Sequence, residues 1–262
     1  GKDFRIFAGH YENSTVIDDV AAAVKGAKMA KAMKNAKVGH LGGPFEGMGD
    51  FAIPADELEK TIGMKVKNFV DGEMPAVDEE EIKAEYALDC ERYAMNSVTY
   101  EQYKGSCRTG LGIRKWIKEN GLTAFTMNFM GVDGDTQFDY MPFAEACKEM
   151  GEGIGYAGEG DVMTAALVGA LLSQYEDTTF AEMFCANWRD NTVYLSHMGE
   201  YNVKSVSSKP DCRVCRFPYG KNAGNPISMM SVFKPGDAVY VSLCPIGGGK
   251  YRFILTEVEA LE

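Results

Sequence analysis

The spacing of hydrophobic positions divides the 262-residue chain into two parts. In the first two-thirds, short apolar runs typical of strands alternate with longer segments whose apolar residues recur at helical spacing. The strand-like runs cover residues 4–8, 38–41, 66–70 and 123–129; the helical segments cover residues 14–27, 54–62, 100–119 and 142–150, with two more helices beginning near Asp78 and Asp161. Ser14 can cap the first helix, whose apolar positions include Ile17, Val20 and Val24. The alternation predicts an α/β fold, a doubly wound and mostly parallel sheet with helices on both faces.

After about Gln174 the pattern becomes β-rich. Short apolar runs cover residues 179–184, 192–197, 212–217, 227–233, 238–243 and 251–256, separated by turns that carry Gly, Pro, Asn and Asp. This pattern is typical of an antiparallel β sandwich or barrel. We therefore expect two domains, an α/β domain over residues 1–175 and a β-rich domain over residues 176–262.

Net charge, the length of apolar runs and the number of cysteines limit the kinds of partner and the cellular compartment that we expect for this chain. The net charge of -11 argues against nonspecific nucleic-acid binding, which uses basic surfaces to neutralise phosphates. The longest apolar run, near residues 165–172, is far shorter than the roughly 20 residues of a membrane helix, and no signal peptide is recognised. Seven cysteines, an odd number without secretory context, favour reduced thiols. The expectation is a cytoplasmic protein with no nucleic-acid or membrane partner.

A glycine-rich turn at residues 155–161, GYAGEGD, places two acids directly before an apolar helix. Asp161 is a natural N-cap for that helix, and capping is the simpler interpretation of the local sequence. However, loops at the carboxyl ends of parallel strands are also where α/β folds bind ligands, so Glu159 and Asp161 are candidate functional residues.

Two other patterns carry less weight. Gly153, Gly155 and Gly158 match the GxGxxG dinucleotide pattern, but a helix precedes them where the motif requires a strand. Cys212 and Cys215 form a single CxxC in a strand-like run, without the second ligand pair of a zinc site. We interpret the glycines as chance matches and the cysteines as ordinary strand residues.

Glu182 and His197 are the remaining candidates. Glu182 lies between apolar residues of a β run, where a buried acid needs a partner, and His197 lies at the end of another β run. With Glu159 they would supply two oxygen ligands and one nitrogen ligand, a set suited to a divalent ion such as Mn²⁺. The sequence by itself does not show that the three meet.

The order of four segments, TAFTMNF, GYAGEGDVMTAAL, TTFAEMF and VYLSHMGE, resembles the L-arabinose isomerase family, which is grouped with the L-fucose isomerases. The resemblance implies a metal-dependent aldose–ketose isomerase that acts on a sugar through an enediolate. It implies Mn²⁺ or another divalent metal as cofactor and a homo-oligomer, a trimer or hexamer.

Site residues follow from the matched motifs. The resemblance implies that Glu159, Glu182 and His197 bind the metal, and that Phe129 lines the substrate pocket. It also matches Asp161 to the acid that follows the first glutamate of the family. As a mechanistic hypothesis, we expect Glu159 and Glu182 to share the acid–base work while Asp161 orients Glu159.

Departures from the family pattern limit these expectations. A further metal-binding histidine and an N-terminal α/β domain of the family have no counterpart here, and His10 and His40 lie in the wrong region to replace the histidine. The chain is expected to be the family's middle domain with an incomplete C-terminal domain, folded but inactive by itself. Met130 and Gly131 stand where arabinose isomerases tend to have an acidic pair, so the sugar is left open.

Two alternatives to the isomerase remain at this point. One is a non-catalytic carbohydrate-binding or regulatory module on the same scaffold, favoured by the unusual segment FCANWRDN after Glu182. The other is a redox protein using Cys212 and Cys215, which requires a thiol pKa lowered well below its usual value.

Overall fold

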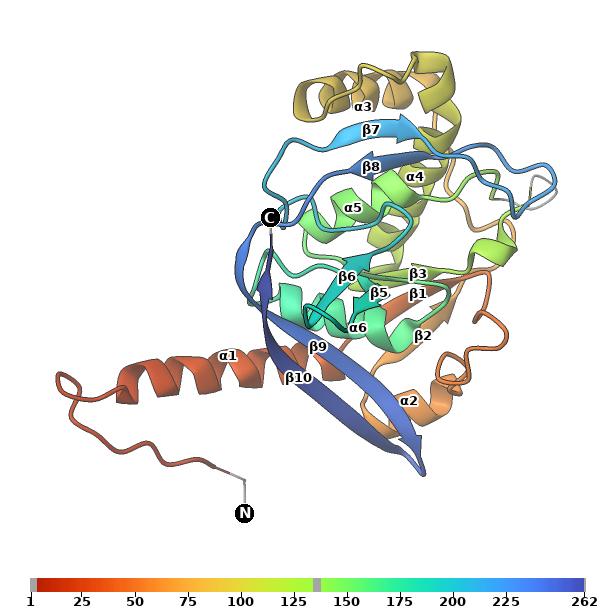
Figure 1. The fold of residues 1–262 in the computed structure, drawn as a ribbon. Helices are drawn as coiled ribbons and strands as arrows, with labels where there is room; N and C mark the ends of the chain where they lie inside the picture. Colours follow the sequence, from red (N-terminus) through yellow and green to blue (C-terminus); the bar gives the residue numbers. More distant parts are fainter. Residues whose placement is uncertain (1–3, 134–137, 262) are drawn as a thin grey trace.

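A four-stranded parallel sheet forms the centre of the computed structural model, which describes residues 4–133 and 138–261 (Figure 1). In spatial order the strands are β2 (Lys65–Asn68), β1 (Lys37–Leu41), β3 (Ala124–Met127) and β4 (Gly155–Gly158). Every neighbouring pair is parallel. The α/β class expected from the alternation of apolar runs is confirmed.

Helices cover both faces of this sheet. The helices of the described residues are α1 (Val16–Lys34), α2 (Ala55–Thr61), α3 (Glu79–Arg92), α4 (Tyr100–Asn120), α5 (Phe143–Gly151) and α6 (Val162–Leu172), with a 3-10 turn η1 (Phe129–Gly131) after β3. Helix α6 packs against one face of the sheet, and α4 and α5 lie over the other (Figure 1). The largest cluster of buried side chains, which includes Trp116, Phe125 and Tyr156, lies between these layers.

Local capping signals set several helix ends. Asp78 begins α3 with a capping box, because its carboxylate accepts from the Glu81 N–H and the Glu81 carboxylate accepts from the Asp78 N–H. Helix α4 ends at Gly121, whose φ of 58° is the left-handed conformation that glycine readily adopts. Both ends agree with the sequence-based expectation.

The remainder of the chain forms three separate antiparallel pairs. They are β5 (Glu182–Asn187) with β6 (Thr192–Ser196), β7 (Asp211–Val214) with β8 (Ile227–Met230), and the long hairpin β9 (Gly236–Gly247) with β10 (Lys250–Ala260). The antiparallel β character is confirmed, and all six expected β runs contain strands. The β7–β8 pair packs on α5, so the β-rich part covers the α/β layers. The domain boundary near residue 175 stays a prediction.

Three local expectations were wrong. Residues 4–8 form no strand but an exposed segment, in which Phe4 is 81% exposed. The N-cap of α1 is Thr15 rather than Ser14, and it makes no side-chain capping bond. Strand β4 was not anticipated, because its four residues include two glycines.

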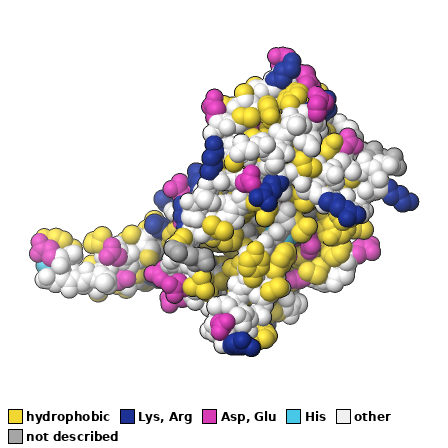
Figure 2. All heavy atoms as spheres, turned by 45° about the horizontal axis from the view of Figure 1, so that its top comes forward, with side chains coloured by type: hydrophobic (Ala, Val, Ile, Leu, Met, Phe, Trp, Pro, Cys, Tyr) yellow, Lys and Arg dark blue, Asp and Glu magenta, His cyan; other side chains and the backbone are white. Residues whose placement is uncertain are grey.

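Helix α1 projects from the body of the molecule (Figure 1). None of its residues is buried, and the apolar positions Ile17, Val20 and Val24 are exposed. Figure 2 shows hydrophobic side chains along this projecting arm. Helical spacing thus predicted the helix correctly; its C-terminal part packs on α6 and the core through Met33, whereas Ile17, Val20 and Val24 in its N-terminal half stay exposed.

A buried ion network joins α3, α4 and α5. Lys148 contacts the carboxylates of Glu85 (2.8 Å) and Asp89. Arg114 donates to both oxygens of Glu85, at 2.8 and 3.0 Å, and to Glu145 at 2.6 Å. Buried charges are tolerated only when paired in this way, so the network fixes the packing of the three helices.

No helix among the described residues is long and apolar enough to cross a membrane.

Candidate metal centre

The chain turns sharply where β4 ends, and Glu159 occupies this turn. Its φ of 63° is uncommon for a residue with a side chain. Two backbone hydrogen bonds fix the turn. The Glu159 N–H donates to the Met127 carbonyl (3.1 Å), and the Glu159 carbonyl accepts from the Phe45 N–H (2.9 Å). Unfavourable backbone angles of this kind persist only where surrounding structure enforces them, and they cluster at functional sites.

Asp161 begins helix α6. Its carboxylate accepts a hydrogen bond from the Thr164 N–H at 2.8 Å, which confirms the capping interpretation. Burial raises the pKa of Asp161 above its ordinary value, although the bonds from Thr164 oppose the shift. The orienting role of Asp161 toward Glu159 stays a prediction.

Glu182 and His197 reach the turn from the β5–β6 hairpin. Glu182 is the first residue of β5, and His197 directly follows β6. Nε2 of His197 lies 3.8 Å from Oε1 of Glu182. One possible ligand atom from each of Glu159, Glu182 and His197 lies within 4.8 Å of the other two. The structure therefore brings together the three side chains that the sequence nominated separately.

Glu200 fixes the orientation of the histidine ring. It is only 2% exposed, and its Oε2 lies 2.6 Å from Nδ1 of His197. Its other oxygen accepts a hydrogen bond of 2.8 Å from the Tyr156 hydroxyl. With Nδ1 bound to Glu200, Nε2 is the ring atom left to face Glu159 and Glu182. A carboxylate behind a histidine is the usual arrangement at metal sites, where it sets ring orientation and ligand basicity.

The electrostatics of the cluster follow from burial and crowding of like charges. Burial raises the pKa of Glu159, and the neighbouring Glu182 carboxylate raises it further. Burial opposes protonation of His197, but the charges of Glu200, Glu182 and Glu159 outweigh it and raise the pKa of the imidazole to about 9. Three carboxylates around one ring thus create a strongly negative site that favours a cation.

A glycine leaves room for the ring. A Cβ atom at Gly158 would lie 2.8 Å from Cε1 and 3.1 Å from Nε2 of His197. Glycine at the last position of β4 therefore allows the hairpin to bring the imidazole next to the strand.

Aromatic side chains lie beside the turn. Phe129 lies in η1, and its ring centroid is 5.1 Å from that of Phe45 and 4.8 Å from that of Tyr219. Because the Phe45 backbone is bonded to Glu159, this stack adjoins the cluster. An apolar wall next to polar groups is typical of small-molecule sites, and the pocket role of Phe129 stays a prediction.

The donor set fits a divalent metal ion. Two carboxylates and one imidazole suit Mn²⁺ and similar ions, and three protein ligands leave coordination positions for water or substrate oxygens. The CxxC cysteines take no part, because Cys212 lies within β7 and Cys215 follows it, both as free thiols. Burial raises the pKa of both thiols, the opposite of what a redox function needs.

Sequence reasoning missed several residues of this site. Glu200 lies three positions after His197, but only its burial and its two hydrogen bonds show what it does. Phe45 and Tyr219 come from a loop and from the β-rich part, and no local pattern connects them with Phe129.

Comparison with known proteins gives consistent matches. The model of the L-arabinose isomerase central domain matches residues 57–175, and that of the L-arabinose isomerase C-terminal domain matches residues 177–262. Together they cover most of the chain.

Curated relatives give the same result. An L-arabinose isomerase of Oceanobacillus iheyensis is 29% identical over 279 residues, covering 100% of this chain and 57% of the relative. L-arabinose isomerase 2 of Bacillus licheniformis is 28% identical over 100% of this chain and 57% of the relative. The enzyme of Halalkalibacterium halodurans is 26% identical over 98% and 54%, respectively. The chain spans about half the length of these relatives, and it belongs to the L-arabinose isomerase family.

Proposed function

We propose that this chain carries the metal centre of a metal-dependent aldose–ketose sugar isomerase. The observation that supports it most strongly is the convergence of Glu159, Glu182 and His197, from a strand end and a separate hairpin, within 4.8 Å. Relatives that match over the whole chain are L-arabinose isomerases, which supports a sugar as the substrate class. Because the chain spans about half of those relatives, the activity is proposed for the complete protein.

Glu159, Glu182 and His197 would hold Mn²⁺ or another divalent ion. When bound, such an ion would act as a Lewis acid that stabilises negative charge developing on the sugar oxygens. Glu200 would keep Nε2 of His197 directed at the ligand position through its 2.6 Å contact with Nδ1.

The carboxylates would also move the proton. Isomerisation transfers a proton between C1 and C2 of the sugar, and this requires a base whose pKa lies closer to neutrality than that of an ordinary carboxylate. Burial and Glu182 shift the pKa of Glu159 in that direction. The side chain of Glu182, the first residue of β5, is more exposed to solvent than that of His197, so it would be able to exchange a proton with the substrate. Phe129, beside Phe45 and Tyr219, would pack against the apolar face of the sugar.

Replacing Glu159 by glutamine in the complete protein tests this assignment. We expect ketose formation from an aldose to fall below detection with Mn²⁺ present, while circular dichroism and the melting temperature change little, because glutamine has the same shape. Glu152→Gln, at an exposed acid of the preceding turn, is the matched control and should keep full activity.

The same assay separates the proposal from its main alternative. Turnover that disappears with a chelator and returns with Mn²⁺ supports the isomerase. Stabilisation of the protein by sugars without turnover would instead support a non-catalytic carbohydrate-binding module. Unchanged turnover in Glu159→Gln would refute the assignment of this residue.

A further inference from the structure

The residues on both sides of Glu159, Gly158 and Gly160, are glycines, so the local backbone by itself does not fix where the carboxylate lies. Glycine is the residue with the widest choice of backbone angles. Glu159 and Gly160 both have positive φ values, 63° and 86°. For a glutamate this conformation is unfavourable, and it persists only where contacts from other parts of the chain enforce it.

A threonine of the central sheet supplies such contacts. Thr126 lies in β3, where the other three residues are apolar, and its side chain is completely buried. The hydroxyl donates a hydrogen bond to the Gly158 carbonyl at 3.2 Å and accepts one from the Gly160 N–H at 3.0 Å. One oxygen atom thus joins the two peptide groups that flank Glu159.

Both bonds require a hydroxyl group. The oxygen must donate to a carbonyl and accept from an amide, which a valine side chain of the same shape cannot do. A buried hydroxyl is costly when it lacks partners, and Thr126 has one for each of these bonds. Threonine is also branched at Cβ, which restricts the rotation of the side chain in a strand and keeps the oxygen directed at the turn.

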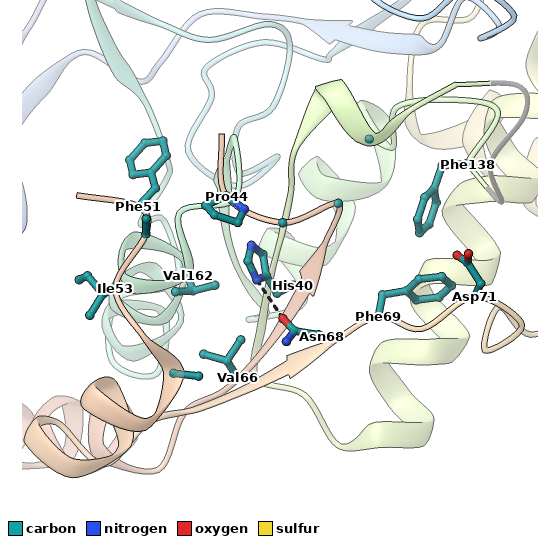
Figure 3. A pocket seen from close by; sticks show the side chains of 15 residues that line it. His40, Pro44, Phe51, Ile53, Val66, Asn68, Phe69, Asp71, Phe138 and Val162 are labelled. Atoms are coloured by element: carbon teal, nitrogen blue, oxygen red, sulfur yellow. Dashed lines mark hydrogen bonds between the residues drawn. The ribbon is translucent and has the colours of Figure 1, made fainter. Parts of the chain in front are cut away.

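A loop after β1 contacts the same turn from another side, but this loop borders open space. A Cβ atom at Gly160 would lie 2.3 Å from the Gly43 carbonyl oxygen. Figure 3 shows Pro44 of this loop at the edge of a cavity that Gly43 also lines. A Cβ atom at Gly43 would meet no atom of the described residues within 4 Å, its chain neighbours aside. Thr126, buried in the central sheet, is therefore the more rigid of the two contacts.

The candidate metal ligands come from two separate parts of the fold. On the β5–β6 hairpin, Glu200 orients the ring of His197. At the end of β4, the described residues give the Glu159 carboxylate no hydrogen bond, so its position depends on the backbone that carries it. Because site residues have to be held within about 0.5 Å of their working positions, this backbone needs an anchor of its own.

We propose that Thr126 is a positioning residue of the metal centre. Its hydroxyl holds the backbone on both sides of Glu159, so that the carboxylate reaches the point where Glu182 and His197 meet. This inference deepens the proposed function and rests on it for the bound ion, whereas the hydrogen bonds that support it do not involve a metal.

Two substitutions separate the hydroxyl from the shape of the side chain. Thr126→Val removes the hydroxyl and keeps the branched shape, and Thr126→Ser keeps the hydroxyl. Thr123→Val is the matched control. The Thr123 hydroxyl, at the opposite end of β3, likewise accepts from one N–H (3.0 Å) and donates to one carbonyl (3.4 Å), both of Lys37.

Hydrogen exchange of backbone amides, measured by NMR on the metal-free chain, tests the positioning directly. In Thr126→Val the Gly160 and Glu159 amides should exchange roughly tenfold faster than in the parent, because the Gly160 N–H loses its acceptor and the turn loosens. The Gly155 N–H, bonded to the Thr123 carbonyl at 3.0 Å where β4 begins, should keep its parental rate. Thr126→Ser should restore slow exchange at both sites.

Calorimetry with Mn²⁺ on the complete protein tests the consequence for the metal centre. Thr126→Val should weaken Mn²⁺ binding by roughly 10- to 100-fold, the usual effect of replacing a residue that orients a metal ligand. Thr126→Ser should recover most of the affinity, and Thr123→Val should bind as the parent does. A purely structural role would give a different order, because serine fills the strand position less well than valine.

Three results would overturn the proposal: parental exchange of the Gly160 amide in Thr126→Val, parental Mn²⁺ affinity in that variant, or binding by Thr126→Ser as weak as by Thr126→Val. Absence of Mn²⁺ binding in the parent would instead refute the metal centre, and exchange at Gly160 would still decide whether Thr126 holds the turn. Failure of the positioning role is thus distinguishable from failure of the proposed isomerase.

Discussion

Replacing Glu200 by glutamine tests the electrostatic basis of the metal centre. Glu200 is buried, and it is the nearest charge to His197, with 2.6 Å between Oε2 and Nδ1. Glutamine keeps the shape and one acceptor but removes the charge. The raised pKa of the imidazole should therefore fall, because burial would then be opposed only by the more distant Glu182 and Glu159.

The size of the effect follows from the pKa of about 9 for His197 against 6.5 for an unperturbed histidine. Because the folded value is the higher one, protonation of His197 stabilises the metal-free protein fully below pH 6.5, and this stabilisation is lost as the pH rises through about 9. The difference corresponds to stabilisation on the order of 3 kcal/mol. Loss of one close opposite charge should lower the pKa by roughly 1–3 units.

Nitrogen-15 NMR of the imidazoles over pH 5–10, without metal, measures the pKa directly, and the chain has only three histidines to assign. Urea unfolding at pH 6.5 and pH 9 should show that the parent loses stability between them and that Glu200→Gln loses less. Tyr156→Phe is the matched control, since it removes the other hydrogen bond of Glu200 but keeps the charge. A pKa of His197 that is equal in the parent and in Glu200→Gln would refute the reasoning.

Three further outcomes are expected. Gly158→Ala should displace the His197 ring, because the new Cβ would lie 2.8 Å from Cε1, and calorimetry with Mn²⁺ should show weaker binding with little change in the fold. Lys148→Met leaves the buried carboxylates of Glu85 and Asp89 without their shared cation and should reduce the free energy of unfolding by roughly 3–5 kcal/mol in urea titrations. Burial opposes ionisation of Glu85, but its cationic partners hold the pKa at about 2. Thermal stability should therefore decrease as the pH falls from about 4.5 toward 2. A melting temperature that does not change over this pH range would contradict a stabilising role of the buried ion network.

Local sequence determined the elements whose signals are local. The capping box at Asp78 and the glycine at 121 fixed helix ends that the structure confirms, and alternating apolar runs located β1, β2 and β3. Residues 4–8 have the composition of a strand but lie exposed, because a strand also needs a neighbouring strand to complete its hydrogen bonds.

Strand β4 is the opposite case, a strand that forms in the structure although the sequence did not predict it. Gly155 has no side chain because α6 packs directly against it, and a Cβ atom there would lie 2.2 Å from the Ala165 carbonyl oxygen. The close packing that makes this strand part of the core also removed the apolar side chains by which it could have been predicted.

The sequence by itself determined the chemistry available at the site: Glu159, Glu182 and His197 stood out as polar groups in apolar surroundings, and the motif order pointed to the family. Only the tertiary structure decided that the end of β4 and the β5–β6 hairpin bring these groups within 4.8 Å. It also decided that Glu200, an unremarked acid in the chain, is the buried partner of His197. The reason is physical: the donor type of a side chain is fixed by its own residue, whereas its neighbours, its burial and hence its pKa depend on packing between segments distant in sequence.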